Sequence, residues 1–218
     1  RSPPPRRSGA LGTITAARAT AAMRAAETLR QDTPPLVVDC YAARLAGAAL
    51  MRERFGRAAL DAEQTAFHLD GTLSAADRTA TPFAPSLIDL IALRTRWIDD
   101  RIIAWTSDVA RPVLILVGAG FDTRAWRMPA LGQTTVVELD RAATLDAKAA
   151  VLDDGERAAP LLCRKRVAVR CDLTASAWEA QLAASLGADE LVDADVMWVL
   201  EGVSGYLSGA ENRAVFAA

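Results

Sequence analysis

The sequence has 218 residues, a size at which one domain can bury a hydrophobic core of its own. Apolar residues make up 51% of the chain and charged residues 24%, and the net charge of -2 gives no reason to expect a nucleic acid or an anionic membrane as partner. No apolar run approaches the roughly 18 residues of a membrane span, so we predict no membrane-spanning helix.

The chain has few residues that suit a disulfide, a zinc ion or nucleophilic catalysis. Cys40, Cys163 and Cys171 are odd in number and lack CxxC spacing, which disfavours a disulfide framework and a metal site. Free cysteines are typical of a reducing compartment, so we expect a cytoplasmic protein. Histidine-dependent catalysis would depend on His68 alone, and an ordinary partly buried or surface histidine is the simpler interpretation.

Residues 1–9, "RSPPPRRSG", are rich in Pro and Arg and are predicted to form a disordered tail. The sequence does not begin with Met, so we expect a fragment or a processed form. The tail is basic but has no apolar stretch, which excludes a secretory signal. As the remnant of a transit peptide, it would imply import into an organelle.

Residues 10–108 are predicted to form an N-terminal helical extension. The alanine-rich segment 14–31 carries charges at helical spacing, and "DTPP" ends this first helix. A second helix is expected over residues 36–56, with Gly56 at its end. A third is expected over residues 87–105, with Ser86 as its N-cap.

The remaining residues, 109–218, alternate between short apolar runs and helical segments. The runs are "PVLILVG", "TTVVELD", "KRVAVRCD" and "ADVMWVLEG", and the helical segments cover residues 141–154 and 174–187. This alternation predicts βαβ units and a parallel sheet that is covered on both faces. We therefore predict an α/β fold: a Rossmann-like, doubly wound, mostly parallel sheet with the N-terminal helical extension. Only four strands are found, so we expect the fold to be truncated at its C-terminus.

Ligands of an open parallel sheet bind beyond the carboxyl ends of its strands, so the residues at these ends are candidate site residues. All four predicted strands end in glycine or acidic residues: Gly118-Ala119-Gly120, then Glu138 and Asp140, then Asp172, then Glu201. The alternative for each acid is a solvated loop or a helix N-cap. Glu138 is the weaker candidate, because it faces the same side of the strand as Asp140 and supports it.

The glycine turn helps to distinguish among cofactors. Gly118 and Gly120 let the backbone approach a ligand, but the G-x-G-x-x-G motif needs a third glycine or an alanine where Thr123 stands. The Asp122 carboxylate would repel a pyrophosphate, and no GK[ST] follows to form a Walker P-loop. S-adenosylmethionine fits better, because it contains adenosine without phosphates and its positive sulfonium suits a pocket rich in carboxylates.

Two of the strand-end acids suit the nucleoside of such a cofactor. Asp140 lies 22 positions after Gly118, close to the roughly 20 expected for an acid that binds ribose hydroxyls. The pair Asp172-Leu173 suits an adenine, because a carboxylate accepts from the exocyclic amine while a leucine packs on the ring.

Arg94 lies in the middle of an apolar stripe on the third predicted helix, whereas Arg96 lies on the opposite, solvated face. The other residues of the stripe are Leu87, Ile91, Ile98, Ile102 and Trp105. A guanidinium among apolar side chains needs an anionic partner. The methionine carboxylate of the cofactor is one candidate, with bidentate geometry, and a salt bridge to Asp122 or Glu201 is the alternative.

Five segments occur in an order that resembles the leucine carboxyl methyltransferase-like family, which includes bacterial polyketide-type O-methyltransferases. They are "RTRWIDD", "LILVGAGFDTRAWRM", "VVELD", "CDL" and "WVLEGVSGYL", within residues 75–208. "TPFAP" stands where many bacterial members have "DPFA". The resemblance implies these contacts: the cofactor carboxylate with Arg94, the glycine turn at Gly118 and Gly120, the ribose with Asp140, adenine with Asp172 and Leu173, and the methionine moiety with Glu201.

We therefore predict an S-adenosyl-L-methionine-dependent O-methyltransferase, whose acceptor is a carboxylate or hydroxyl of a small molecule or of a protein C-terminus. A carboxylate acceptor needs no general base. A hydroxyl acceptor does, and Tyr206 and Glu201 are the candidate catalytic residues. Tyr206 is otherwise an aromatic that covers the end of the sheet. Two other functions stay open: a non-catalytic, truncated binding module and an NAD-type oxidoreductase.

Overall fold

The computed structural model describes residues 10–30, 34–55, 84–153, 155, 158–175 and 178–217. The predicted tail 1–9, His68 and the expected helix end Gly56 lie outside these ranges. Within them, no helix combines the length and the apolar character needed to cross a membrane.

Four parallel strands form one sheet in the order β3-β2-β1-β4. The strands are β1 (Pro112–Val117), β2 (Thr135–Asp140), β3 (Lys165–Arg170) and β4 (Asp195–Leu200). The register places Ile115 of β1 opposite Val137 of β2 and Trp198 of β4. The chain runs outward from β1 to β3 and then returns to the other side of β1, so the strand order reverses between β1 and β4. The α/β Rossmann-like fold predicted from the sequence is confirmed.

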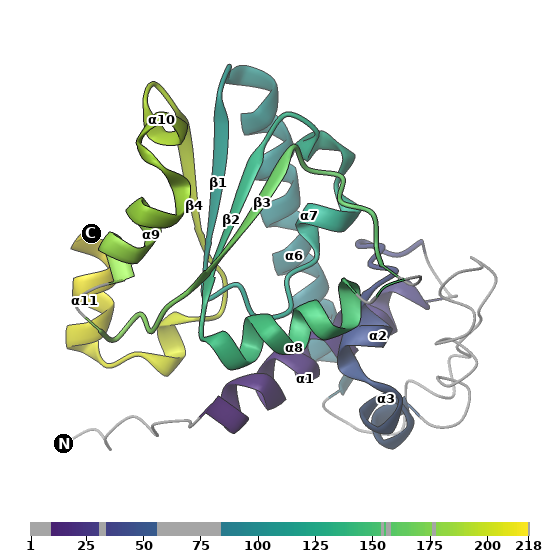
Figure 1. The fold of residues 1–218 in the computed structure, drawn as a ribbon. Coiled ribbons are helices and arrows are strands. Elements are labelled where there is room, and N and C mark those ends of the chain that lie inside the picture. Colours follow the sequence, from purple (N-terminus) through teal and green to yellow (C-terminus); the bar gives the residue numbers. More distant parts are fainter. Residues whose placement is uncertain are drawn as a thin grey trace.

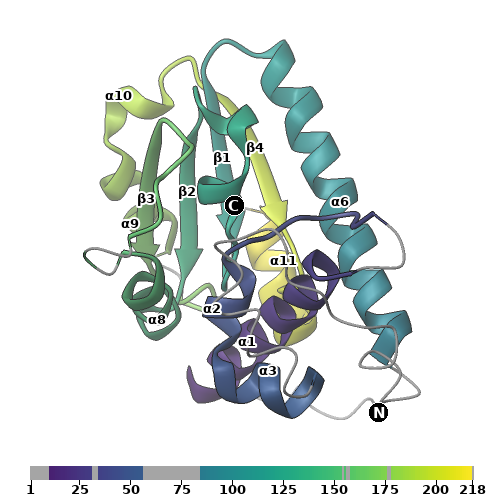
Figure 2. The same ribbon diagram turned by 90° about the vertical axis from the view of Figure 1, so that its right-hand side faces the viewer.

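Helices cover both faces of this sheet (Figures 1 and 2). One face shares a hydrophobic core with α1 (Ala10–Thr28), α2 (Ala42–Ala46), α3 (Ala48–Phe55), α6 (Ala84–Asp108), α7 (Arg124–Arg127), η1 (Pro129–Leu131) and α8 (Ala142–Leu152). The other face packs against α9 (Trp178–Leu186) and α11 (Gly209–Ala217), and the short segments α10 (Ala188–Leu191) and η3 (Ser204–Tyr206) flank β4. Because both faces are covered, all six residues of β1 are buried.

The N-terminal helices share one core with the sheet. Ala21, Ala22, Ala25 and Ala26 of α1 are all buried, and small side chains at these positions let α1 approach its neighbours closely. The same core contains Leu114 of β1. The helical extension 10–108 and the sheet domain 109–218 therefore pack around a common interior. The boundary between them stays a prediction.

The segment 36–56 differs from the single helix that was expected. Residues 36–41 are not helical, and the helical part is divided into α2 and α3 at Gly47, whose φ is +84°. This left-handed conformation interrupts the hydrogen-bonding pattern of a continuous helix and favours glycine. The expected N-cap at Ser86 is also wrong, since α6 already begins at Ala84.

Among the glycines that the structure describes, Gly118 is the one at which an added Cβ would meet the closest neighbour. It has φ of +67°, and a Cβ at this position would lie 2.7 Å from Cγ2 of Val203. Val203 follows β4, so this contact lets the segment after β4 lie directly on the turn after β1. Both the backbone conformation and the close approach therefore require glycine at position 118.

We expect Gly118→Ala to lower the free energy of unfolding by about 1–3 kcal/mol, because the added methyl group meets a branched side chain in a left-handed backbone. Gly205→Ala is the matched control, since a Cβ there has no neighbour within 4 Å and φ is not positive. Urea denaturation of both variants measures the difference. Equal stability of the two variants would contradict the steric assignment.

A separate polar cluster lies at the amino end of β2, opposite the carboxyl ends of the strands. Thr135 Oγ1 donates to Glu190 Oε1 over 2.6 Å, Lys165 Nζ lies 3.3 Å from Glu190 Oε2, and Arg164 also pairs with this carboxylate. These contacts, the hydrogen bond from Thr135 foremost, lower the pKa of Glu190 from 4.5 to about 2.

Because the pKa of Glu190 falls on folding, its carboxylate stabilises the fold above pH 4.5, and this stabilisation is lost as the pH falls towards 2. We expect Glu190→Gln to cost about 1 kcal/mol at pH 7, with a smaller difference from the wild type at each step below pH 4.5. Chemical denaturation across this pH range tests it. Glu53→Gln, at an exposed position of α3, serves as the control for the loss of one carboxylate.

Candidate functional site

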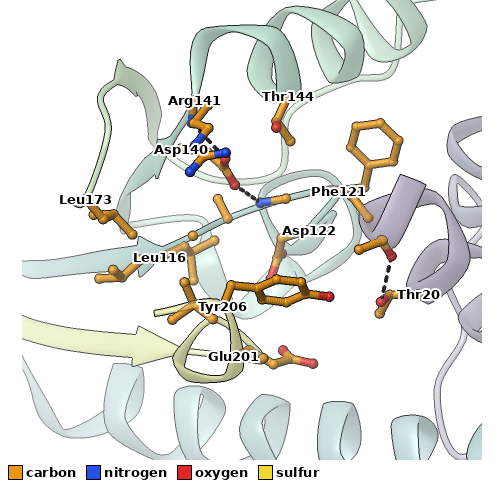
Figure 3. Close-up of a pocket in the computed structure, with 18 of the residues that line it drawn as sticks. Thr20, Leu116, Phe121, Asp122, Asp140, Arg141, Thr144, Leu173, Glu201 and Tyr206 are labelled. Carbon is orange, nitrogen blue, oxygen red and sulfur yellow. Dashed lines mark hydrogen bonds between the residues drawn. The ribbon is translucent and has the colours of Figure 1, made fainter. Parts of the chain in front are cut away.

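A cavity of about 1040 Å³ opens at the carboxyl ends of the four strands (Figure 3). Helices α1 and α6 and the segment after β4 complete its wall. One candidate from the sequence, Glu138, does not line this cavity, but the other candidate site residues do: Arg94, Gly118, Ala119, Gly120, Asp140, Asp172, Leu173, Glu201 and Tyr206. The carboxyl ends of the predicted strands therefore meet at this cavity, while the individual roles of these residues stay predictions.

Three backbone amides of the glycine turn (residues 118–122), those of Ala119, Gly120 and Asp122, already have hydrogen-bond acceptors within the protein. Gly120 N donates to Asp140 Oδ2 over 2.7 Å, and Ala119 N donates to the carbonyl oxygen of Leu139. Asp122 N donates to the carbonyl oxygen of Ala119, and Arg124 N donates to Asp122 Oδ1. A phosphate-binding loop presents such amides to its ligand instead. This turn is therefore built to pack and to orient Asp140, and it does not offer these amides to a pyrophosphate.

Asp140 and Asp172 lie at one end of the cavity, on neighbouring strands. Asp140 Oδ2 accepts from the Gly120 amide, and its Oδ1 accepts from Arg141 N, so the carboxylate has a fixed orientation. Asp172 Oδ1 accepts from the backbone and the hydroxyl of Thr174, which lowers the pKa of Asp172. Its side chain is 49% exposed and its Oδ2 lies 4.0 Å from Arg141. Both acids and Leu173 line the cavity, where the carboxylates can act as hydrogen-bond acceptors. Asp140 and Leu173 are labelled in Figure 3.

Arg94 and Glu201 lie on the α6 side of the cavity. Arg94 Nε pairs with Glu201 Oε1 at 2.9 Å, which is the salt bridge that the sequence left open as an alternative. The Arg94 side chain is 36% exposed, so part of its guanidinium stays accessible. Glu201 Oε2 is engaged as well, at 2.9 Å from Nη2 of Arg124. Glu201 thus joins two guanidinium groups, and both of its oxygens already have donors.

Arg124 is a buried residue of the site region that the sequence patterns did not indicate. Its side chain is 1% exposed and pairs with Asp99, Asp122 and Glu201. Burial opposes the charge on Arg124, but these three carboxylates outweigh it, so the pKa of Arg124 is raised. The pKa of Asp122 is lowered despite its burial, because Arg124 and Lys148 lie close. The negative charge of Asp122 is therefore balanced by cations within the protein. The sequence-based expectation that Asp122 would repel a pyrophosphate did not include these cations.

Thr123 stands where the G-x-G-x-x-G motif has its third glycine, and the structure gives it a role of its own. It is fully buried, and its hydroxyl donates to Asp39 Oδ2 over 2.7 Å. The same hydroxyl accepts from Nε of Arg127, whose Nη1 and Nη2 contact Asp99. A glycine at position 123 would leave Asp39 and Arg127 without this hydrogen bond. Thr123 is therefore a polar link between the turn and the non-helical segment before α2 that contains Asp39.

Glu138 does not line the cavity, which agrees with its lower rank among the predicted acids. It is fully buried and pairs with Lys148 Nζ and Arg166 Nη2, both at 2.9 Å from Oε2. The cations in turn lie over the ring of Trp126. Glu138 is therefore a structural ion-pair residue beneath the sheet end.

Tyr206 lies in η3, on the segment after β4, and is 49% exposed. In Figure 3 its ring lies over the cavity, and its hydroxyl is directed towards the α1 side, where Thr20 lies. The α1 residues Ala17, Thr20 and Arg24 also line the cavity, although sequence reasoning did not select them. The pattern of the strand ends could not indicate these residues, because they precede β1 by about 90 positions and approach it only when the chain folds.

Comparisons with known proteins agree with this architecture. The leucine carboxyl methyltransferase family matches residues 17–218. A relative from Mycobacteroides abscessus is 35% identical over 193 residues, and one from Mycobacterium sp. (strain JLS) is 39% identical over 191 residues. Both are provisionally named S-adenosyl-L-methionine-dependent methyltransferases.

These alignments include 88% and 87% of this chain but 57% of each relative, so the chain spans just over half the length of the curated relatives it matches. The family match, in contrast, extends over nearly the whole chain and includes the cavity, the glycine turn and the Arg124 ion pairs. On this evidence, the chain belongs to the leucine carboxyl methyltransferase family.

Proposed function

We propose that this chain binds S-adenosyl-L-methionine and forms the cofactor-binding part of a methyltransferase that acts on an oxygen nucleophile. The observation that carries the proposal is the convergence of the glycine turn, Asp140, Asp172-Leu173 and the Arg94–Glu201 pair on one cavity. The names of the relatives support the same cofactor. When bound, this cofactor supplies a methyl group on a positively charged sulfur.

The nucleoside half of the proposed ligand suits the end of the cavity that holds the two acids. The Asp140 carboxylate is oriented by the Gly120 amide and can accept from ribose hydroxyls. Asp172 stays ionised over a wide pH range because Thr174 lowers its pKa, and it can accept from an amine. Leu173 offers an apolar surface to an aromatic ring.

The amino-acid half of the proposed ligand suits the α6 side of the cavity. Arg94 has exposed donor surface that fits a carboxylate, and the Glu201 carboxylate fits an ammonium or sulfonium cation nearby. Because Glu201 is also held by Arg124, a ligand carboxylate would share Arg94 with it rather than displace it. The site therefore offers one partner for each charge of a zwitterionic ligand.

The acceptor is proposed to be a carboxylate or a hydroxyl, on a small molecule or a protein C-terminus. With a carboxylate, the chain needs only to hold the acceptor in line with the methyl group and to exclude water. With a hydroxyl, a base is needed, and Tyr206 suits this role better than Glu201. Both oxygens of Glu201 already accept from guanidinium groups, whereas the Tyr206 side chain is half exposed at the cavity.

Titration calorimetry of the 218-residue chain with S-adenosylmethionine, S-adenosylhomocysteine and NAD tests the proposed cofactor. We expect both adenosyl compounds to bind and NAD not to bind, because the amides of Ala119, Gly120 and Asp122 are already hydrogen-bonded within the protein. Binding of NAD alone would overturn the proposal in favour of an oxidoreductase. Binding of the adenosyl compounds without methyl transfer to any acceptor would identify a binding module.

Paired substitutions at the two ends of the cavity test the orientation of the cofactor. Arg94→Met should weaken S-adenosylhomocysteine about tenfold or more and leave adenosine nearly unchanged, because only the former has the carboxylate. Asp140→Asn should weaken both ligands by similar factors, since both have the ribose. Calorimetry with the two ligands gives the ratios. Equal losses for both ligands in Arg94→Met would show that the carboxylate does not lie at Arg94.

A further inference from the structure

Two consecutive carbonyl oxygens at the end of the glycine turn accept hydrogen bonds from buried cations on different helices. Arg24 Nη2 of α1 donates to the carbonyl oxygen of Phe121 over 2.6 Å. Lys148 Nζ of α8 donates to the carbonyl oxygen of Asp122 over 3.1 Å. Each cation has its own buried carboxylate, Asp39 for Arg24 and Glu138 for Lys148. The turn is thus held from two sides.

The Arg24–Asp39 pair makes the more extensive contact with the turn. Asp39 Oδ2 accepts from Nε of Arg24 at 2.8 Å and from the Thr123 hydroxyl at 2.7 Å. The side chains of Asp39 and Arg24 are 0% and 8% exposed. The pair therefore contacts the main-chain carbonyl of Phe121 and the side-chain hydroxyl of Thr123. Each of these contacts joins residues more than 80 positions apart in the sequence.

The same helix that supplies Arg24 also forms a wall of the cavity. Ala17, Thr20 and Arg24 recur on one face of α1 and line the cavity opposite the strand ends. A Cβ on Gly120 would lie 3.7 Å from the Cβ of Ala17, so α1 packs directly on the turn. The position of α1 and the conformation of the turn are therefore mechanically connected, because one ion pair contacts both.

We propose that Arg24 and Asp39 are a positioning pair, which holds the glycine turn in its binding conformation and thereby makes cofactor affinity depend on the docking of α1. This inference rests on the proposed function, because it concerns the affinity for the same cofactor. Arg24 acts through the turn. Its guanidinium donates to both Asp39 and the carbonyl oxygen of Phe121, and this contact fixes the position from which the Gly120 amide donates to Asp140. Without the pair, the backbone of the turn keeps its course, but the carbonyl oxygen of Phe121 loses its hydrogen bond while that of Asp122 keeps the one from Lys148.

The double variant Arg24→Met/Asp39→Asn tests the pair without leaving a buried charge unpaired. We expect it to fold, to bind S-adenosylhomocysteine roughly tenfold more weakly than the wild type, and to show faster amide hydrogen exchange within residues 118–124. Arg164→Met/Glu190→Gln is the matched control, because it removes an ion pair at the opposite end of the sheet. This control should change global stability without changing the affinity or the local exchange.

The outcomes separate the inference from the proposed function. If the wild type binds S-adenosylhomocysteine and the folded double variant binds within twofold of it, the positioning pair is overturned and the proposed function stands. If the wild type does not bind, the proposed function fails, and the effect of the pair on cofactor affinity fails with it. If the double variant does not fold, Arg24→Lys replaces it: a single ammonium keeps the charge near Asp39 but lacks the fork, so undiminished affinity would overturn the inference.

Discussion

Arg124 begins α7 with its side chain almost fully excluded from solvent, and its guanidinium contacts carboxylates from three separate parts of the chain. Asp99 comes from α6, Asp122 from the glycine turn and Glu201 from the end of β4. Removing Arg124 would take a positive charge from among three largely buried carboxylates, which is far more costly than losing a surface ion pair. This one cation thus joins the helix α6, the turn after β1 and the end of β4, and all three of these parts contribute residues to the wall of the cavity.

The arrangement of charge around Arg124 also determines what the cavity can offer a ligand. Asp122 is neutralised within the protein, and Glu201 is shared between Arg124 and Arg94. Arg94 is thereby held at the rim with part of its guanidinium exposed, while Asp140 and Asp172 face the cavity at the other end. An uncompensated acidic pocket would favour any cation. A pocket with a guanidinium at one end and acceptors at the other instead favours a ligand with a carboxylate, a cationic centre and hydroxyl donors in that order.

The glycine turn resembles a dinucleotide-binding loop in sequence but differs from one in its hydrogen bonds. Its amides donate to Leu139, Asp140 and Ala119 within the protein, and its last two carbonyls accept from Arg24 and Lys148. The turn is therefore a rigid support that orients Asp140, whereas a phosphate loop acts through its own free amides. This difference in the use of the backbone supports an adenosine-containing cofactor without phosphates, as proposed, over a dinucleotide.

The α/β class, the four strands and the residues at their carboxyl ends could all be predicted from the sequence, because strand patterning is local and parallel strands bring their ends to one edge. Arg94 was identified for a similar reason: a charge in an apolar helical stripe needs a partner, and the structure supplies Glu201. The roles of Arg124, Thr123 and Asp39 could not be predicted in this way. Thr123 meets Asp39 across 84 positions, and Arg124 meets Asp99 and Glu201 across 25 and 77 positions, and no local period encodes which distant groups meet. The expected helix 36–56 was likewise shortened in the folded chain: residues 36–41 are not helical, and within them Asp39 enters the interior and pairs with Arg24, a distant contact that no local helix propensity encodes.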